Sequence, residues 1–169
     1  MLDMIAQFMD AGGEVLYLIA VLMFLMWTLI FERSWYFLRG LKADRQAAID
    51  KWEARLERKS WHAHQIRNML ISEVKLNIRQ NMPMIKTMVA LCPLFGLLGT
   101  VWGMIGVFNV MAVTGGGDVQ AMASGVSQAT IPTMAGMVAA LSGLFANTFL
   151  SRTAEREAML LEDKLTMDH

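Results

Sequence analysis

One charged side chain, that of Asp118, lies between Lys86 and Arg152. Asp118 follows three consecutive glycines and divides the intervening residues into two uncharged stretches. The hydrocarbon core of a bilayer is roughly 30 Å thick, so about 20 residues of internally hydrogen-bonded helix cross it. Both stretches are long enough to do so. The pattern predicts two membrane-spanning helices joined by a short turn, at 87–113, 119–151 and 114–118 respectively.

A third membrane span is predicted at 15–31, where an uncharged stretch lies between Glu14 and Glu32. Hydrophobic residues make up 55% of the chain and the mean hydropathy is +0.40, which agrees with a membrane protein. Residues 1–14 carry acids and no Lys or Arg, unlike the start of a signal peptide, so we expect a retained span. Before it, an amphipathic stripe is expected to lie on the outer membrane surface; its members are Leu2, Ile5, Phe8 and Met9.

The distribution of charge predicts the topology. Residues 32–86 carry twelve Lys and Arg against six acids, whereas residues 1–14 carry acids alone. By the positive-inside rule, 32–86 is cytoplasmic; with three spans, the N-terminus and 114–118 are then periplasmic and the tail 152–169 is cytoplasmic. Because acids are interspersed with the bases and topology explains their excess, nucleic-acid binding is not expected.

The cytoplasmic segment reads as helical, because residues 41–82 contain neither Gly nor Pro and apolar residues recur at helical spacing. The best break between two helices is Lys59-Ser60-Trp61, since Ser60 can cap a following helix, and Pro83 marks a restart before the second span. A three-four repeat of apolar residues in 152–169 predicts that the third span continues into a cytoplasmic bundle.

Residues for enzymatic chemistry are scarce. Cys92, the single cysteine, lies inside the second span beside Pro93, where packing is its expected role. His62 and His64 lack further ligands at metal spacing, and no nucleophile–base pair is evident. We therefore expect no enzyme, no metal site and no cofactor.

Small residues line one face of the second span, where steps of three and four residues separate Gly96, Gly99, Gly103 and Gly106. Such a face lets another helix approach closely in lipid, and Gly136 of the third span is assigned the same packing role. The third span is polar for a lipid-facing helix, with nine hydroxyl or amide side chains that need protein or water: Ser124, Ser127, Gln128, Thr130, Thr133, Ser142, Asn147, Thr148 and Ser151.

Two hydroxyls are expected at the same depth. Thr100 and Thr133 lie near the centres of their spans, so in antiparallel neighbours both are roughly 20 Å along the axis from the charged ends. A polar pathway would be narrowest there, lined by Thr100, Thr133, Gln128 and Thr130. Pro132 could loosen the helix and free a backbone carbonyl toward that pathway.

None of the three spans contains a carboxylate, Lys, Arg or His, although proton-conducting helices normally need an ionisable relay. Threonine hydroxyls orient hydrogen bonds but hold no proton charge near neutral pH. Two interpretations stay open at this point. Either the chain is a structural scaffold whose polar faces bury against neighbours, or a partner supplies the titrating group.

The motifs of the two later spans resemble those of the MotA/TolQ/ExbB proton-channel family. Residues 96–105 read Gly-Leu-Leu-Gly-Thr-Val-Trp-Gly-Met-Ile, similar to that family's G-L-L-G-T-V-x-G-M-I signature. Residues 125–136 resemble the helix that follows it, and Glu32-Arg33 resembles the exit of its first span. Three spans argue against the four-span flagellar stator branch. The short length and residues 24–33 are most similar to small ExbB proteins of TonB systems.

The resemblance implies an all-α inner-membrane protein forming a homopentameric ring, with the second and third helices around a central pore. An ExbD-like single-span partner would supply a membrane-embedded Asp inside that ring. Its protonation would drive motion passed to a TonB-like protein that energises outer-membrane transport. A TolQ-like motor for envelope integrity or constriction is the alternative within the family, and a scaffold without proton coupling is the alternative outside it.

Two departures from the family pattern limit what carries over. Gln128 stands where many ExbB sequences have Glu, so a role that needs a titrating carboxylate does not transfer to it. Ser142 stands where relatives often have Pro. Gln128 still donates and accepts hydrogen bonds, but it does not titrate, so the group that carries the proton is expected to come from the partner.

Overall fold

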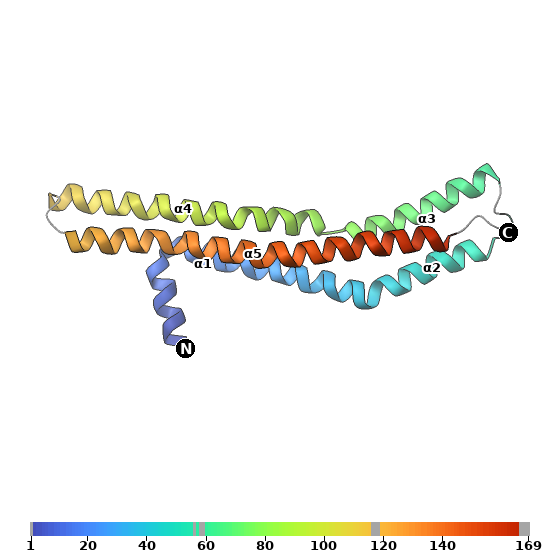
Figure 1. Cartoon of the computed structure of the whole chain (residues 1–169), viewed down its shortest axis with the longest axis horizontal. Coiled ribbons are helices and arrows are strands. Elements are labelled where there is room, and N and C mark those ends of the chain that lie inside the picture. Colours follow the sequence, from blue (N-terminus) through green and yellow to red (C-terminus); the bar gives the residue numbers. More distant parts are fainter. Residues whose placement is uncertain (1, 56, 58–59, 116–118, 166–169) are drawn as a thin grey trace. The chain divides into compact units, whose positions relative to one another are not determined.

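The computed structural model describes residues 2–55, 57, 60–115 and 119–165, and these residues form helices joined by short connections (Figure 1). The elements in order are α1 Leu2–Trp35, the π-helical turn η1 Tyr36–Gly40, α2 Leu41–Glu53, α3 Trp61–Arg79, α4 Met82–Thr114 and α5 Val119–Lys164. The all-α prediction is confirmed. Residues 116–118 of the predicted turn, 166–169 of the predicted tail, and Lys59 lie outside the described residues.

Among the described residues, three helical segments are long and apolar enough to cross a membrane, in agreement with the predicted number of spans. They are Gly12–Glu53, Trp61–Thr114 and Val119–Lys164. Each segment is longer than the predicted span, because it includes a charged part: after residue 31 in the first, before residue 87 in the second and after residue 151 in the third. The limits 15–31, 87–113 and 119–151 therefore stay predictions from the charge pattern. The chain is a membrane protein by these helices.

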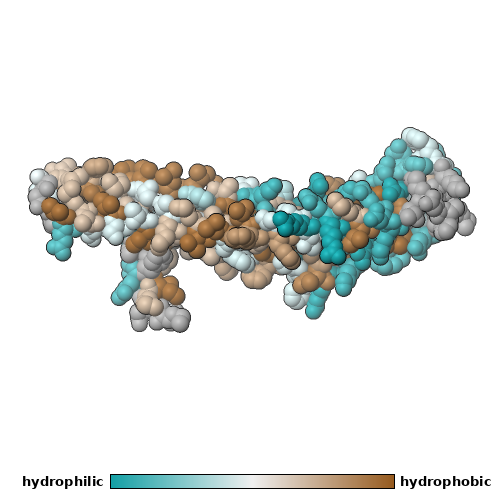
Figure 2. Space-filling view, in the orientation of Figure 1, coloured by the Kyte–Doolittle hydropathy of each residue, from teal (hydrophilic) through white to brown (hydrophobic). Residues whose placement is uncertain are grey.

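The chain forms two compact units, and each long helix is divided between them. The first consists of Met1–Thr28 and Ile85–Phe145, and the second of Leu29–Met84 and Ala146–His169. Figure 2 shows hydrophobic side chains over the first unit and hydrophilic ones over much of the second. This division follows the charge pattern, because the uncharged parts of α1, α4 and α5 form the first unit.

In the first unit, α1 changes direction at Gly13, whose backbone is not helical (φ 67°, ψ −165°) (Figure 1). A positive φ is accessible to glycine because it has no Cβ, so the Gly12-Gly13 pair separates a short N-terminal helical segment from the span. Of the predicted amphipathic stripe, Ile5 is exposed and Met9 half-buried, and the side chains of Leu2 and Phe8 lie outside the described structure. Its place on a membrane surface stays a prediction.

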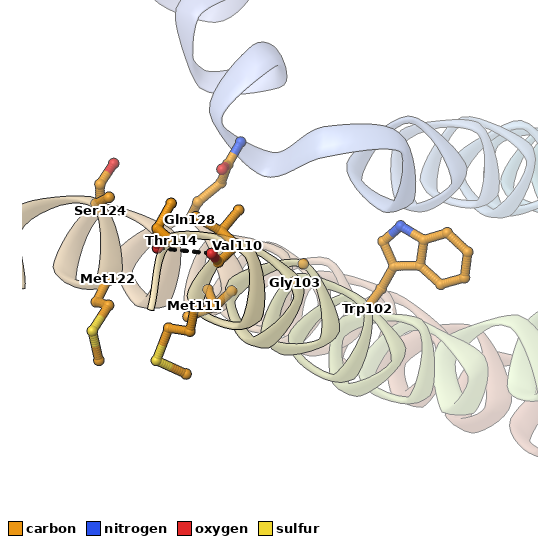
Figure 3. A pocket seen from close by; sticks show the side chains of 12 residues that line it. Trp102, Gly103, Val110, Met111, Thr114, Met122, Ser124 and Gln128 are labelled. Carbon is orange, nitrogen blue, oxygen red and sulfur yellow. Dashed lines mark hydrogen bonds between the residues drawn. The ribbon is translucent and has the colours of Figure 1, made fainter. Parts of the chain in front are cut away.

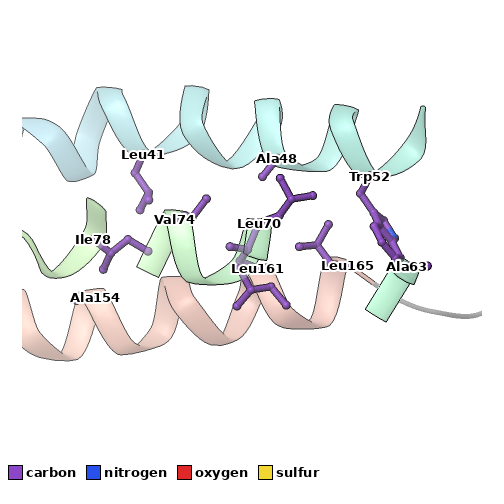
Figure 4. Close-up of a cluster of buried hydrophobic side chains, with 11 residues drawn as sticks. Leu41, Ala48, Trp52, Ala63, Leu70, Val74, Ile78, Ala154, Leu161 and Leu165 are labelled. Atoms are coloured by element: carbon purple, nitrogen blue, oxygen red, sulfur yellow. The ribbon is translucent and has the colours of Figure 1, made fainter. Parts of the chain in front are cut away.

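The second unit is a small helical bundle with a hydrophobic core contributed by α2, α3 and the end of α5 (Figure 4). Its buried members are Leu41, Ala48, Trp52, Ala63, Leu70, Ile71, Val74, Ile78, Ala154, Leu161 and Leu165. The three-four spacing of these residues puts them on one face of each helix, as the sequence predicts. The cytoplasmic location of this bundle remains a prediction.

Side chains satisfy the helix ends of this unit. Ser60 caps α3, since its Oγ accepts a hydrogen bond of 3.2 Å from the Ala63 amide, which confirms the predicted helix start. At the end of α5, the Arg67 guanidinium donates to the carbonyls of Leu165 at 2.6 Å and Glu162 at 3.1 Å. These carbonyls lack partners within their own helix, and a cation there also complements the helix dipole.

Arg33 does the same for α3 and is almost fully buried, with 1% of its surface exposed. Its Nε donates to the Gln80 carbonyl and its Nη2 to the Asn77 carbonyl, both at 2.6 Å. The chain breaks just beyond, where Asn81 has a φ of 63° and donates a 3.2 Å hydrogen bond to Glu32. The restart predicted from Pro83 is confirmed, because α4 begins at Met82.

Candidate functional site in the contact between α4 and α5

The second and third spans, in α4 and α5, pack against each other at glycine residues. A Cβ placed on Gly96 would lie 2.9 Å from the Cα of Thr133 and 3.0 Å from the Pro132 carbonyl oxygen. A Cβ on Gly103 would lie 2.6 Å from that of Ala129, and one on Gly136 would lie 2.5 Å from the Cys92 carbonyl oxygen. The backbones are therefore in direct contact, which small residues alone permit. Gly106 differs, because nothing lies within 4 Å of its Cβ position.

One threonine hydroxyl bridges the two helices. Thr133 Oγ1 donates a 2.9 Å hydrogen bond to the Gly96 carbonyl, and Thr133 is half-buried. Thr100, also half-buried, donates instead to the Leu97 carbonyl of its own helix at 2.6 Å. The helices α4 and α5 run antiparallel, because Gly96 contacts Thr133 whereas Gly103, later in α4, contacts Ala129, earlier in α5. Gly99 faces Pro132, so Thr100 and Thr133 lie within one helical turn of the same level.

Pro132 leaves α5 continuous, since this helix runs unbroken from Val119 to Lys164. Its ring is buried against Gly99. Proline has no amide hydrogen, so the carbonyl of Gln128 loses the donor that an α-helix would give it. A helix break at Pro132 is thus not present, while the Thr133 side chain turns toward α4. An opening of that carbonyl toward a pathway stays a prediction.

The other two polar residues of the predicted pathway are exposed. Thr130 donates to the Ser127 carbonyl at 2.8 Å, within its own helix. Gln128 lines a cleft of about 500 Å³ between α4 and α5, in which Met111 and Met122 point to the same side (Figure 3). The Gln128 Nε2 lies 3.5 Å from the Asp10 carbonyl oxygen, a contact at the long limit of a hydrogen bond. None of these polar groups titrates near neutral pH.

Two buried polar residues acquire their importance only from the structure. Arg33, which the sequence placed among the topology-setting cations, anchors the α3–α4 junction. Burial lowers the pKa of its guanidinium, although from a value so high that the group stays charged. Asn147 is 5% exposed and its Oδ1 has no partner among the described residues, in a helix where an unpaired amide is costly. The sequence singled out Asn147 only as one of several polar residues.

Among the described residues there is no group of three or more His, Cys, Asp or Glu side chains that could hold a metal. The contact between α4 and α5 can orient hydrogen bonds, and the two helices can change their separation where they pack at glycine. It holds no carboxylate, Lys, Arg or His of its own, because all of these side chains lie outside the charge-free stretches. A proton-coupled role would therefore need a group from elsewhere.

A sequence model of the MotA/TolQ/ExbB proton channel family matches residues 35–163. The chain is 32% identical over 165 residues to the putative biopolymer transport protein ExbB-like 1 of Synechocystis sp., covering 79% of this chain and 65% of that one. It is 33% identical over 82 residues to the biopolymer transport protein ExbB of Xanthomonas campestris, covering 48% of this chain and 32% of the relative.

A Tol-Pal system relative matches as well. The chain is 29% identical over 84 residues to TolQ of Haemophilus influenzae, covering 50% of this chain and 37% of TolQ. In these three matches, the chain spans between about a third and two thirds of the length of the curated relatives. The family model, which matches residues 35–163, covers α4 and nearly all of α5, the two helices that form the candidate site.

Proposed function

Because this chain belongs to the MotA/TolQ/ExbB proton channel family, we propose that it is an ExbB-like subunit of an inner-membrane motor driven by the proton motive force. In this proposal it works with an ExbD-like protein and energises TonB-dependent outer-membrane transport. Relatives named for biopolymer transport favour this branch. The observation that carries the proposal is the glycine contact bridged by Thr133 and Gly96 in helices that carry no charge there.

The partner is proposed for a chemical reason. A channel that moves protons through a dry membrane core needs a group that changes charge, and hydroxyls and amides do not. An ExbD-like single span carrying an Asp would supply that group beside Thr100, Thr133, Gln128 and Thr130. Protonation neutralises such an Asp, and its preferred position against hydroxyls then changes, because the charged form accepts hydrogen bonds more strongly.

The proton motive force is large enough for this task. One proton crossing 100 mV releases about 2.3 kcal/mol, which shifts a two-state equilibrium nearly fiftyfold. We propose that several copies of the chain, five in the ring that the family resemblance implies, surround the partner. Large apolar side chains are exposed on α4 at Leu97, Val101, Ile105 and Phe108, and lipid or neighbouring copies would cover them.

The proposed orientation has the N-terminus in the periplasm, the small helical bundle in the cytoplasm and the C-terminal tail there as well. It follows from the excess of Lys and Arg in 32–86. A TolQ-like motor for envelope integrity is the second candidate, favoured by the match to TolQ. Complementation separates the two, since an ExbB-like chain restores iron-chelate uptake and a TolQ-like chain restores resistance to detergent.

Iron-chelate uptake in cells lacking the native subunit tests the proposal, with Thr133→Val compared with wild type at matched membrane levels. Thr133→Val removes the hydroxyl at nearly constant shape, and we expect uptake to be lost while the ExbD-like partner still co-purifies. Thr133→Ser keeps the hydroxyl and should retain uptake. Ser142→Ala removes a hydroxyl bonded within α5, at 2.8 Å to Ala139, and should be neutral. Equal uptake by Thr133→Val would overturn the assignment of Thr133.

A further inference from the structure

The exit of the first span carries an outward stripe that the proposed motor does not use. It begins with two aromatic residues, continues with an aliphatic one and ends basic; its members are Phe31, Trp35, Leu38, Arg39 and Lys42. Phe31 is 66%, Trp35 62% and Leu38 70% exposed, and Arg39 and Lys42 are exposed too. Phe31 and Trp35, which lie four residues apart in α1, share a helix face. None of the five packs into the core of the bundle.

The stripe crosses the depth at which lipid headgroups lie. Glu32 is the first charge after the uncharged span. By helix rise, Trp35 lies about 4.5 Å and Arg39 about 10 Å beyond it along the axis. The polar headgroup layer occupies roughly 5 to 8 Å on each side of the hydrocarbon core. Trp35 therefore lies inside this layer, and the Arg39 backbone lies a few ångströms past its outer edge. The Arg39 side chain reaches the level of Trp35, because its guanidinium carbon lies 4.6 Å from the centroid of the Trp35 ring.

The geometry of Trp35 and Arg39 suits an anion. The Arg39 guanidinium carbon lies 4.6 Å from the centroid of the Trp35 ring, so the two side chains stack. Stacking uses the face of the guanidinium and leaves its N–H edge for an acceptor. Within the described residues, Arg39 has no ion pair with a carboxylate, in contrast to Arg45, which pairs with Glu157 at 3.1 Å.

A pocket of about 510 Å³ lies beside this pair, lined by Glu32, Trp35, Tyr36, Arg39 and Gly40. Its inner wall is closely packed. A Cβ on Gly40 would lie 2.6 Å from the Tyr36 ring, the Tyr36 hydroxyl donates to Asp44 at 2.5 Å, and Arg33 lies 4.8 Å from the Tyr36 ring. The π-helical turn Tyr36–Gly40 forms this wall, and such turns are frequent at functional sites. The Glu32 carboxylate, which also lines the pocket, accepts a hydrogen bond from Asn81.

We propose that Trp35, Arg39 and Lys42 bind the headgroup of an anionic phospholipid, with the phosphate on the Arg39 edge and an acyl chain along Phe31. A basic, aromatic-flanked pocket at the end of a span is the arrangement that recognises such headgroups. Lys42 adds a second positive charge, so a lipid with net negative charge binds more tightly than a zwitterionic one. This site is independent of proton coupling and requires only that the first span crosses the membrane.

Native mass spectrometry of the full-length protein in a mild detergent tests the site. The protein is titrated with phosphatidylglycerol or with phosphatidylcholine of the same chain length. We expect wild type to retain one tightly bound phosphatidylglycerol per subunit, and Arg39→Gln to bind it about fivefold more weakly, as one lost basic contact predicts. Trp35→Leu should weaken it as well. Lys51→Gln is the matched control, because Lys51 is exposed on α2 and this variant loses the same charge.

Three results would overturn the proposal. Equal losses in Arg39→Gln and Lys51→Gln would show a general effect of net charge. Equal affinity of wild type for the two lipids would exclude recognition of an anionic headgroup. Displacement of phosphatidylglycerol by inorganic phosphate at millimolar concentration would show that the pocket binds free phosphate and not a lipid. A loss confined to Arg39→Gln and Trp35→Leu, without such displacement, would support it.

Discussion

Adding one methyl group to Gly96 should separate α4 from α5. The new Cβ of Gly96→Ala would lie 2.9 Å, 3.0 Å and 3.3 Å from backbone atoms of Pro132 and Thr133, where ordinary contacts begin near 3.4 Å. Backbone atoms cannot rotate away, so the helices must move apart by a few tenths of an ångström or more. Overpacking of this kind costs about 1 to 3 kcal/mol, and stretching the Thr133–Gly96 hydrogen bond adds about 0.6 kcal/mol.

Gly106→Ala is the matched control, because it makes the same change in the same helix with nothing within 4 Å of the new methyl. Both variants gain the same helix propensity, about 1 kcal/mol, so their difference isolates the steric cost. We expect Gly96→Ala to be less stable than Gly106→Ala by about 2 kcal/mol. For a chain of this size that corresponds to a melting temperature roughly 4 to 8 °C lower.

Thermal unfolding of the two purified variants in the same detergent, followed by near-ultraviolet circular dichroism, measures this difference. Size-exclusion chromatography confirms that both have the oligomeric state of wild type. Equal melting temperatures would refute the reasoning, because the contact at Gly96 would then not limit the approach of the helices. A lower temperature for Gly106→Ala would do so too, since it would put the close contact at the wrong glycine.

Three further predictions concern the second unit. Arg33→Met should leave the carbonyls of Asn77 and Gln80 unpaired and destabilise the α3–α4 junction by about 1 to 3 kcal/mol, seen as faster amide hydrogen exchange there; Arg79→Met, an exposed control, should leave exchange unchanged. Burial and the Asp44 hydrogen bond raise the pKa of Tyr36, so its neutral form stabilises the fold below the ordinary tyrosine pKa of about 10, and this contribution is lost as pH rises through the raised value. In an absorbance titration at alkaline pH, the tyrosine deprotonation step at the higher pH should be absent from Tyr36→Phe. Its persistence in this variant would contradict the raised pKa of Tyr36. Ser60→Ala should cost about 1 kcal/mol through loss of the α3 cap and speed exchange in the first turn, whereas Ser72→Ala on the exposed face should not; equal rates would argue against the cap.

Much of the fold follows from local patterns. The three spans, the start of α3 at Ser60 and the restart near Pro83 depend on nearby residues alone, because charge-free length, side-chain caps and missing amide hydrogens act within a few positions. The spacing of Gly96, Gly99 and Gly103 indicates a close helix neighbour for the same reason. The π-helical turn Tyr36–Gly40 has no such local signature, so the sequence alone does not predict it.

Sequence by itself determined that the chain crosses a membrane in three helices, that these spans hold no carboxylate, Lys, Arg or His, and that small and hydroxyl residues gather in two of them. Tertiary structure decided which partner each polar group receives. Both threonines were expected to line one pathway, yet Thr133 bonds across to α4 and Thr100 bonds within it. Likewise Arg33, one of many basic residues after the first span, acquires its partners from carbonyls more than forty residues away. Hydrogen-bond partners across helices depend on rotation and register, which only packing of the whole unit sets.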